Sequence, residues 1–179
     1  MDIGKINKYV VRGDKMDIRF QTEQDDVMAI SHVYEESWKS AYKGLIPQTY
    51  LEEIPKGHWA NALKSGIWKN ILMLDGEKII GTSAYCAARD EKLNGYGEIV
   101  SIYFLPDYMG KGYGKLLFKE VLNRLHIEGY KDIYLWVLEG NNRAIRFYEK
   151  LGFKPNGAYL DDNIGGKDLK ELQYVYHIE

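Results

Sequence analysis

The sequence predicts a single α/β domain in which about seven strands are interspersed with helices along 179 residues. Short apolar and β-branched runs, such as Glu98–Leu105 and Asp132–Leu138, are typical of interior strands. Longer segments that carry an apolar stripe at helical spacing and end at glycine are typical of helices packed against a sheet. No linker or repeat divides the chain, so one domain is expected.

The first half of the chain is expected to supply one strand, three helices and a hairpin. Apolar residues alternate in the opening strand and recur at helical spacing after it. Gly44 and Pro47 then interrupt the helical pattern, and the pair Asp75-Gly76 is typical of a hairpin turn. In chain order, we expect a strand at 17–22, a helix from Thr22 or Gln24 to about Tyr42, short helices at 48–54 and 58–64, and strands at 71–74 and 78–88.

The second half of the chain is expected to alternate strands with helices and to end in a hairpin. Pro106 ends the first of these strands, while Gly129 and Gly152 are placed to close the two helices. The pair Gly165-Gly166 is typical of the final hairpin turn. We expect strands at 98–105, 132–138, 158–164 and 169–178, one helix from the loop 110–114 to Gly129, and one at 141–151.

Residues 1–15 are expected to form an N-terminal extension, a candidate for poor order, ahead of a single domain at 16–179. The segment is charged, contains Gly4 and Gly13, and ends before a second methionine, Met16. The first clear strand pattern begins directly after Met16. The domain boundary is therefore placed at residue 16.

Composition excludes several classes of protein. Hydrophobic residues make up 45% of the chain and charged residues 28%, which suits a folded globular domain rather than a disordered chain. The formal charge of -2 provides no electropositive field for nucleic acid. No apolar run is long enough to span a membrane, and residues 1–15 lack the apolar core of a signal peptide. A cytoplasmic protein without nucleic-acid or membrane partners is expected.

Cysteine and histidine are too sparse in the sequence for a metal site. The lone Cys86 cannot form an intramolecular disulfide, and its apolar strand context favours a buried, inert thiol over a nucleophile. The four histidines are far apart and show no spacing typical of metal ligands. We therefore expect no metal and no covalent intermediate on Cys86.

A glycine-rich loop, Met109–Lys115, lies at a predicted strand-to-helix junction. Unpaired backbone N–H groups and the positive end of the helix dipole make such a junction a site for phosphate. A nucleotide P-loop would need Gly at Met109 and Ser or Thr at Leu116, and the dinucleotide fingerprint would need a third Gly at Lys115. Neither nucleotide motif fits. The alternative is a loop whose glycines serve only a tight turn and helix packing.

Two segments of the second half carry a family pattern. The loop Met109-Gly110-Lys111-Gly112-Tyr113-Gly114 is similar to Gln/Arg-x-x-Gly-x-Gly/Ala except at Met109. Residues Asn141–Phe153 are similar to Asn-x-x-Ala-x-x-x-Tyr-x-x-x-Gly-Phe at every defined position. Over about residues 98–153 the chain therefore resembles the GCN5-related N-acetyltransferase (GNAT) family. The resemblance implies a mixed α/β, mostly antiparallel sheet with helices on both faces, a central V-shaped splay, and acetyl-CoA as co-substrate.

The resemblance also implies which residues bind acetyl-CoA. Backbone amides of the glycine loop hold the pyrophosphate, so the departure at Met109 leaves the anion site in place. The splayed strand is expected to offer main-chain hydrogen bonds to the pantetheine arm. Basic side chains can neutralise the phosphates, unless their charges are simply solvated. The implied set is Ile102, Tyr103, Phe104, Met109, Gly110, Lys111, Gly112, Tyr113, Gly114, Lys115, Asn141 and Arg143.

Tyr148 and Glu98 are the expected catalytic residues. In the family pattern Tyr148 lies beside the sulfur, where a phenol can protonate the leaving thiolate. An amine acceptor must lose a proton before it attacks, and Glu98 stands where histone-modifying members carry a basic glutamate. The alternatives are a solvent-exposed Glu98 at a strand end, a Tyr148 that only fills the core, and an Asn141 that only caps its helix.

The acceptor pocket is implied only by region. Family members build it from the first helices and the terminal hairpin, which points to Trp38, Tyr42 and Asp161 as substrate-pocket residues. Aromatic rings and carboxylates suit a cationic amine. Trp38 and Tyr42, four residues apart on one predicted helix, equally suit a place in the core.

We therefore expect transfer of an acetyl group from acetyl-CoA to a primary amine of a small molecule, polyamine or peptide, by direct attack in a ternary complex. The alternative is a non-catalytic module that binds or senses acyl-CoA. Such a module would keep the glycine loop and Asn141 but would need neither Glu98 nor Tyr148. Monomer and homodimer both stay open.

Overall fold

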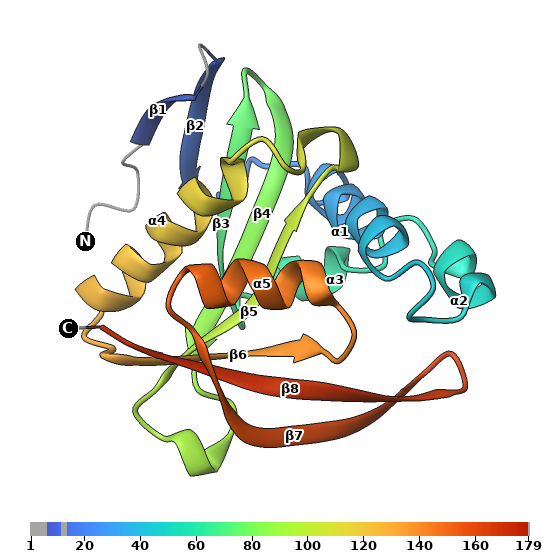
Figure 1. The fold of residues 1–179 in the computed structure, drawn as a ribbon. Coiled ribbons are helices and arrows are strands. Elements are labelled where there is room, and N and C mark those ends of the chain that lie inside the picture. Colours follow the sequence, from blue (N-terminus) through green and yellow to red (C-terminus); the bar gives the residue numbers. More distant parts are fainter. Residues whose placement is uncertain (1–6, 12–13, 179) are drawn as a thin grey trace.

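A computed structural model of the protein describes residues 7–11 and 14–178, and Figure 1 shows how its elements are arranged. The strands are β1 (Asn7–Val11), β2 (Asp14–Phe20), β3 (Lys69–Asp75), β4 (Lys78–Ala87), β5 (Gly97–Phe104), β6 (Asp132–Leu138), β7 (Lys154–Ile164) and β8 (Lys167–His177). The helices are α1 (Val27–Ala41), α2 (Gln48–Glu53), α3 (Ala60–Lys64), α4 (Tyr113–Ile127) and α5 (Asn142–Lys150), with short 3-10 helices η1 (Glu91–Leu93) and η2 (Pro106–Tyr108). No helix in these ranges is long and apolar enough to cross a membrane.

All of these strands belong to one sheet, in the order β1-β2-β3-β4-β5-β6-β8-β7. Every neighbouring pair is antiparallel except β5 and β6, which run parallel. Parallel neighbours need a crossover connection, and α4 provides it. The expected mixed and mostly antiparallel sheet is confirmed, with eight strands in place of about seven.

The additional strand, β1, comes from the segment expected to be an extension. Tyr9 pairs with Met16 of β2, and its hydroxyl donates to Glu120 Oε2 on α4 at 3.1 Å. Tyr9 and the two valines that follow it favour extended backbone. Residues 7–11 therefore form an edge strand of the sheet and do not behave as a poorly ordered extension. Residues 1–6 and 12–13 lie outside the described part of the chain.

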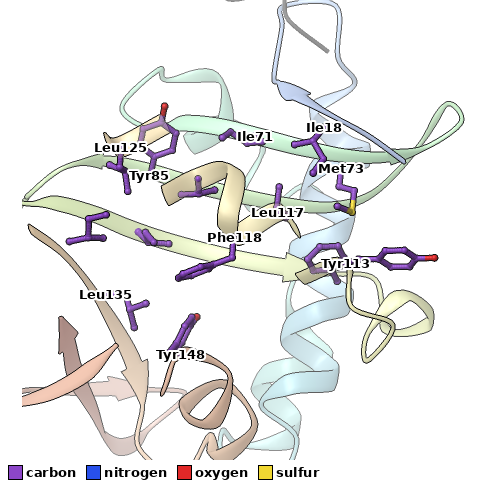
Figure 2. Close-up of a cluster of buried hydrophobic side chains, with 14 of the residues drawn as sticks. Ile18, Ile71, Met73, Tyr85, Tyr113, Leu117, Phe118, Leu125, Leu135 and Tyr148 are labelled. Carbon is purple, nitrogen blue, oxygen red and sulfur yellow. The ribbon is translucent and has the colours of Figure 1, made fainter. Parts of the chain in front are cut away.

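Helices cover both faces of the sheet because alternate strand residues point to opposite sides. On β3, Ile71 and Met73 pack on the α4 side, whereas Leu72 and Leu74 pack on the side of α1 and α3. Figure 2 shows the larger of these clusters, in which Phe118 of α4 is fully buried. Burial of each large apolar side chain contributes about 1.5–3 kcal/mol.

The sheet opens between β5 and β6. Pairing joins only Gly97–Ile99 to Ile133–Leu135, and beyond these residues the two strands diverge. The divergence begins at Val100, an extra residue in β5 that has no partner on β4. A bulge of this kind bends a strand and increases its twist. The predicted V-shaped splay is confirmed.

The boundary of the first helix differs from the prediction. α1 starts at Val27, after the expected Thr22 or Gln24, because Asp26 caps it with a carboxylate that accepts a first-turn N–H at 2.8 Å. The terminal hairpin also begins earlier than expected, since a register shift in β7 keeps residues 154–157 within the strand.

Candidate active site

A cleft of about 640 Å³ lies in the splay between β5 and β6. Its walls come from these two strands, the glycine loop, the start of α4, α5 and the end of α1. The splay thus gathers segments that are far apart in the sequence (Figure 1). The predicted cofactor residues that line the cleft are Ile102, Tyr103, Phe104, Met109, Gly110, Gly112, Gly114, Lys115, Asn141 and Arg143.

The glycine loop forms the N-terminal end of α4 with backbone that glycine adopts easily. Gly110 and Gly112 have φ angles of 76° and 95°, and Gly112 is the N-cap of the helix. A glycine at this position has no side chain with which to cap the helix. The N–H of Gly114, in the first turn of the helix, has no acceptor within α4 and is therefore available to an anion. The loop has the geometry of a phosphate site.

Gly114 is a glycine that the packing of α4 does not require. A Cβ placed there would lie 3.6 Å from Phe147, which is an ordinary contact. Glycine within a helix costs about 0.5–1 kcal/mol relative to alanine. Because Gly114 lines the cleft, the missing side chain leaves room for a ligand that lies close to the helix backbone.

Arg143 supplies a positive charge where the loop departs from the family signature. Its Nη1 group donates to the sulfur of Met109 at 3.2 Å, and both residues line the cleft. The signature has Gln or Arg at position 109, so a guanidinium from α5 here stands beside that position. A guanidinium binds phosphate oxygens through two parallel hydrogen bonds.

Helix α5 places Asn141 and Tyr148 on the cleft. Asn141 Oδ1 accepts the N–H of Ala144 at 3.2 Å, which confirms the capping interpretation and leaves the Nδ2 group as a donor for a ligand. Tyr148 is 8% exposed and packs on Phe118 with 5.7 Å between ring centroids (Figure 2). Burial, with a smaller contribution from Tyr103, raises the pKa of Tyr148 above its ordinary value. Its hydroxyl therefore stays protonated at neutral pH.

Main-chain groups of β5 face the cleft at alternate residues. The N–H of Leu105 donates to the Ile80 carbonyl, on the β4 side, at 2.9 Å. Successive N–H groups alternate between the two edges of a strand, so those of Ile102 and Phe104 point to the splay. Of the three predicted strand contacts, Tyr103 therefore presents its side chain and not its N–H.

A second cavity, of about 260 Å³, adjoins the cofactor cleft, and we call it the aromatic cavity. All four tryptophans of the chain line it, namely Trp38, Trp59, Trp68 and Trp136. Tyr34, Tyr42 and Tyr103 complete the aromatic lining, and the charged residues are Arg89, Glu98 and Glu171. It shares with the cofactor cleft a wall formed by Tyr42, Ile99, Val100, Ser101, Tyr103 and Trp136. Trp38 and Tyr42 thus reach the predicted pocket region.

A buried hydrogen-bond network fixes Trp59 in the lining of the aromatic cavity. Glu35, 4% exposed, accepts from Ser31 Oγ at 2.8 Å and from the N–H of Gly57 at 2.7 Å. Ser31 Oγ in turn accepts the N–H of Trp59 at 3.1 Å. The Trp59 ring stacks on Tyr34 with 5.4 Å between centroids. Since unpaired buried polar groups are costly, the network holds this loop against α1.

Glu98 lines the aromatic cavity but is not a free carboxylate. It is 1% exposed, Arg89 donates to both of its oxygens, and the Tyr134 hydroxyl donates to Oε2 at 2.7 Å. Burial raises the pKa of Glu98, but the hydrogen bonds from Arg89 and Tyr134 outweigh it, and the pKa lies below its ordinary value. The solvent-exposed alternative for Glu98 is therefore wrong. The same contacts make it a weak proton acceptor.

Replacing Glu98 with Gln should lower the free energy of unfolding at pH 7 by about 1–3 kcal/mol, because Arg89 and Tyr134 lose an ionic partner. The pKa of Glu98 is lowered in the folded state, so its stabilising effect is present above the ordinary value of 4.5 and is lost as the pH falls through the folded-state pKa. Urea unfolding of both proteins from pH 7 to pH 3 checks this. A difference that does not shrink in acid would contradict it.

Three predicted residues have side chains outside both cavities. Tyr113 is buried in the main core (Figure 2). Lys111 lies at the surface, with its Nζ 5.4 Å from the centre of the Tyr108 ring. Asp161 is exposed on β7 opposite Lys170, whereas Glu171 lies opposite the preceding residue of β7. Since strand side chains alternate between faces, Asp161 points away from the face that carries Glu171. The structure therefore does not bring Asp161 to the aromatic cavity.

Sequence reasoning missed several residues of the aromatic cavity. Arg89 lies in a loop, and its pairing with Glu98 depends on the bend of the chain after β4. From the terminal hairpin, the strand register places Glu171 in the lining of this cavity. The further missed residues are Tyr34, Trp59, Trp68 and Trp136.

The splay of the sheet thus holds a glycine loop at one helix end and an aromatic cavity beside it. The chain belongs to the acetyltransferase (GNAT) family, whose family model matches residues 30–153. It is an acyltransferase of the N-acetyltransferase class.

Similar proteins span most of the chain. YuaI, an uncharacterised N-acetyltransferase of Bacillus subtilis, is 27% identical over 155 residues, covering 85% of this chain and 88% of that protein. The spermidine N(1)-acetyltransferase of Thermoplasma acidophilum is 27% identical over 160 residues, covering 84% and 92%. The crystal structure of the paiA N-acetyltransferase from Thermoplasma acidophilum in complex with coenzyme A has the same fold, with a TM-score of 0.69 at 22% identity over 90% of this chain and 99% of that chain.

Proposed function

We propose that this enzyme transfers an acetyl group from acetyl-CoA to a primary amine bound in the aromatic cavity, by direct attack in a ternary complex. The main support for this proposal is the wall that the two cavities share, because substrates bound in the two cavities would lie next to each other. Bound acetyl-CoA supplies the acetyl group as a thioester.

Groups of the chain account for binding and for one proton transfer. The loop N–H groups and the guanidinium of Arg143 hold the phosphates. The N–H groups of Ile102 and Phe104 donate into the splay, where such donors stabilise developing negative charge. Tyr148 gives its proton to the departing sulfur, and its raised pKa ensures that the proton is present at neutral pH.

The aromatic cavity suits a slender, cationic amine. Aromatic ring faces attract cations, and the carboxylate of Glu171 adds negative charge. A volume of about 260 Å³ admits a small alkylamine or the end of a polyamine or peptide, but not a folded protein surface. The name of the Thermoplasma relative, a spermidine N(1)-acetyltransferase, supports a polyamine as the first acceptor to test.

Cys86 has the properties of an inert thiol, which supports direct transfer. Burial, together with the charge of Glu98, raises the pKa of Cys86 to about 11. Very little thiolate is then present at neutral pH. Among the described residues, no three His, Cys, Asp or Glu side chains are grouped so as to hold a metal ion.

Calorimetric titration with acetyl-CoA, followed by a thiol-release assay in a buffer free of primary amines, tests the function. We expect micromolar binding and release that depends on an added amine, with polyamines and small alkylamines ahead of peptides. Binding without release for any amine would favour a sensing module instead. No binding would mean that the glycine loop is only a turn.

A further inference from the structure

We propose that Glu171 of β8 is the carboxylate that faces the acceptor amine and takes its proton. The inference rests on the proposed function. It assigns a residue to the step for which Glu98, bound by Arg89 and Tyr134, is poorly suited.

The pairing of the last three strands directs Glu171 into the aromatic cavity. It lies opposite Leu138 on β6 and Leu160 on β7. Leu138 lines the same cavity. The next residue, Leu172, packs against the main core on the other face of the sheet, as alternation requires. A shift of one residue would remove the carboxylate from the cavity.

Glu171 is close to the phenols at the boundary between the two cavities. Burial is the main cause of the raised pKa of Tyr42 and of Tyr103, and the charge of Glu171 adds to it in both cases. The phenols of Tyr103 and Tyr148 also affect Tyr42. Tyr42 therefore interacts electrostatically with both the proposed acid, Tyr148, and Glu171.

Glu171 differs from Glu98 in its freedom to accept a proton. No hydrogen bond from another described residue holds its carboxylate. Burial and then repulsion from Asp162 raise the pKa of Glu171 above its ordinary value, while Arg89 opposes them. A carboxylate with a raised pKa is a better base for an ammonium. The titratable and charged groups facing it are Asp162 of β7, Glu98 and Tyr103 of β5, Arg89 of the loop after β4, and Tyr42 at the end of α1.

Protons and electrons balance with these roles. A primary ammonium gives one proton to Glu171 and becomes a neutral amine. Its nitrogen lone pair forms the new C–N bond while the C–S bond breaks, and the electron pair of that bond goes to sulfur. Tyr148 protonates the sulfur and regains a proton from the nitrogen. The proton on Glu171 then passes to solvent.

Glu171→Gln in the full-length protein tests the proposal, with Glu98→Gln alongside it. Gln is close to Glu in shape but cannot take the proton. We expect kcat of the wild type to rise with pH, and Glu171→Gln to lower kcat by about 100-fold or more and to remove that rise. Glu98→Gln should keep that rise, and Glu171→Asp should restore part of the lost rate.

Tryptophan fluorescence provides a readout that does not depend on turnover. Because all four tryptophans line the cavity, spermidine added to the free protein should change their emission. We expect this change to persist in Glu171→Gln, which shows that the variant is folded and still binds the amine. If Glu171→Gln loses both the spermidine-induced change in emission and cooperative thermal unfolding, the variant is misfolded. The pH profile of Glu171→Asp then tests the proposal in its place.

Glu139→Gln is the matched control, because it makes the same change at an exposed glutamate close to Glu171. The N–H of Glu139 donates to the carbonyl of Lys170, but Glu139 lines neither cavity. It should leave kcat and the pH profile unchanged. A wild-type kcat and pH profile in Glu171→Gln would overturn the proposal. So would a rise in the KM for the amine alone, because Glu171 would then only hold a charge. If the wild type shows no amine-dependent thiol release, the proposed function itself fails.

Discussion

Replacing Tyr148 with Phe should lower kcat by about 100-fold or more while leaving the affinity for acetyl-CoA near that of the wild type. The phenyl ring keeps the contacts with Phe118, Phe147 and Phe153, so the core is preserved. Only the hydroxyl is lost, and with it the proton for the departing sulfur. Thiol release and calorimetric titration on the same preparation separate these two effects.

A neighbouring hydroxyl provides the control for this variant. Tyr176 stacks on Phe153 with 5.1 Å between ring centroids and lies outside both cavities. Tyr176→Phe removes only its hydroxyl and should keep full activity. An acyl donor with a more acidic thiol needs less protonation, so the deficit of Tyr148→Phe should shrink with it. Equal activity of Tyr148→Phe and wild type would remove Tyr148 from the mechanism, and Tyr42 or Tyr103 would become the next candidates.

Replacing Gly114 with Leu should weaken acetyl-CoA binding by about 10- to 100-fold with little change in the stability of the free protein. Leucine is a good helix former, and the Cβ position itself is free of clashes. The rest of the side chain must occupy the cleft that Gly114 lines. Calorimetric titration measures the affinity, and thermal unfolding without ligand measures the stability.

Alanine at the same position separates volume from backbone effects. Gly114→Ala adds only the Cβ, which would meet Phe147 at an ordinary 3.6 Å. It should bind acetyl-CoA and unfold at the same or a higher temperature, because alanine favours the helix by about 0.5–1 kcal/mol. If Gly114→Leu also binds normally, the co-substrate does not lie along this end of α4.

Local patterns predicted most of the elements and one side of the site. The strand at 132–138 and the helix at 48–54 agree with β6 and α2 to within a residue. The glycine loop was located because glycines are grouped at a strand-to-helix junction, and the positive φ angles of Gly110 and Gly112 are ones that glycine adopts easily. The acetyltransferase family was also reached from contiguous motifs, and the family match confirms it.

Residues whose roles depend on strand register or on distant partners were not predicted. Glu98 was found, but its binding by Arg89 and Tyr134 arises from a loop and a neighbouring strand. Asp161 was chosen and Glu171 was not considered, because a hairpin sequence does not reveal which of its residues face a cavity. Since strand side chains alternate, a single register step reverses that choice.

The sequence by itself determined the α/β class, the position of the glycine loop and the family, because these depend on short-range periodicity, on glycine conformations and on contiguous motifs. The tertiary structure decided the rest. A bulge at Val100 separates β5 from β6, four tryptophans from distant segments line one cavity, and β8 directs Glu171 into it. These features arise when segments far apart in the chain pack together, and packing of that kind leaves no short-range pattern to be recognised.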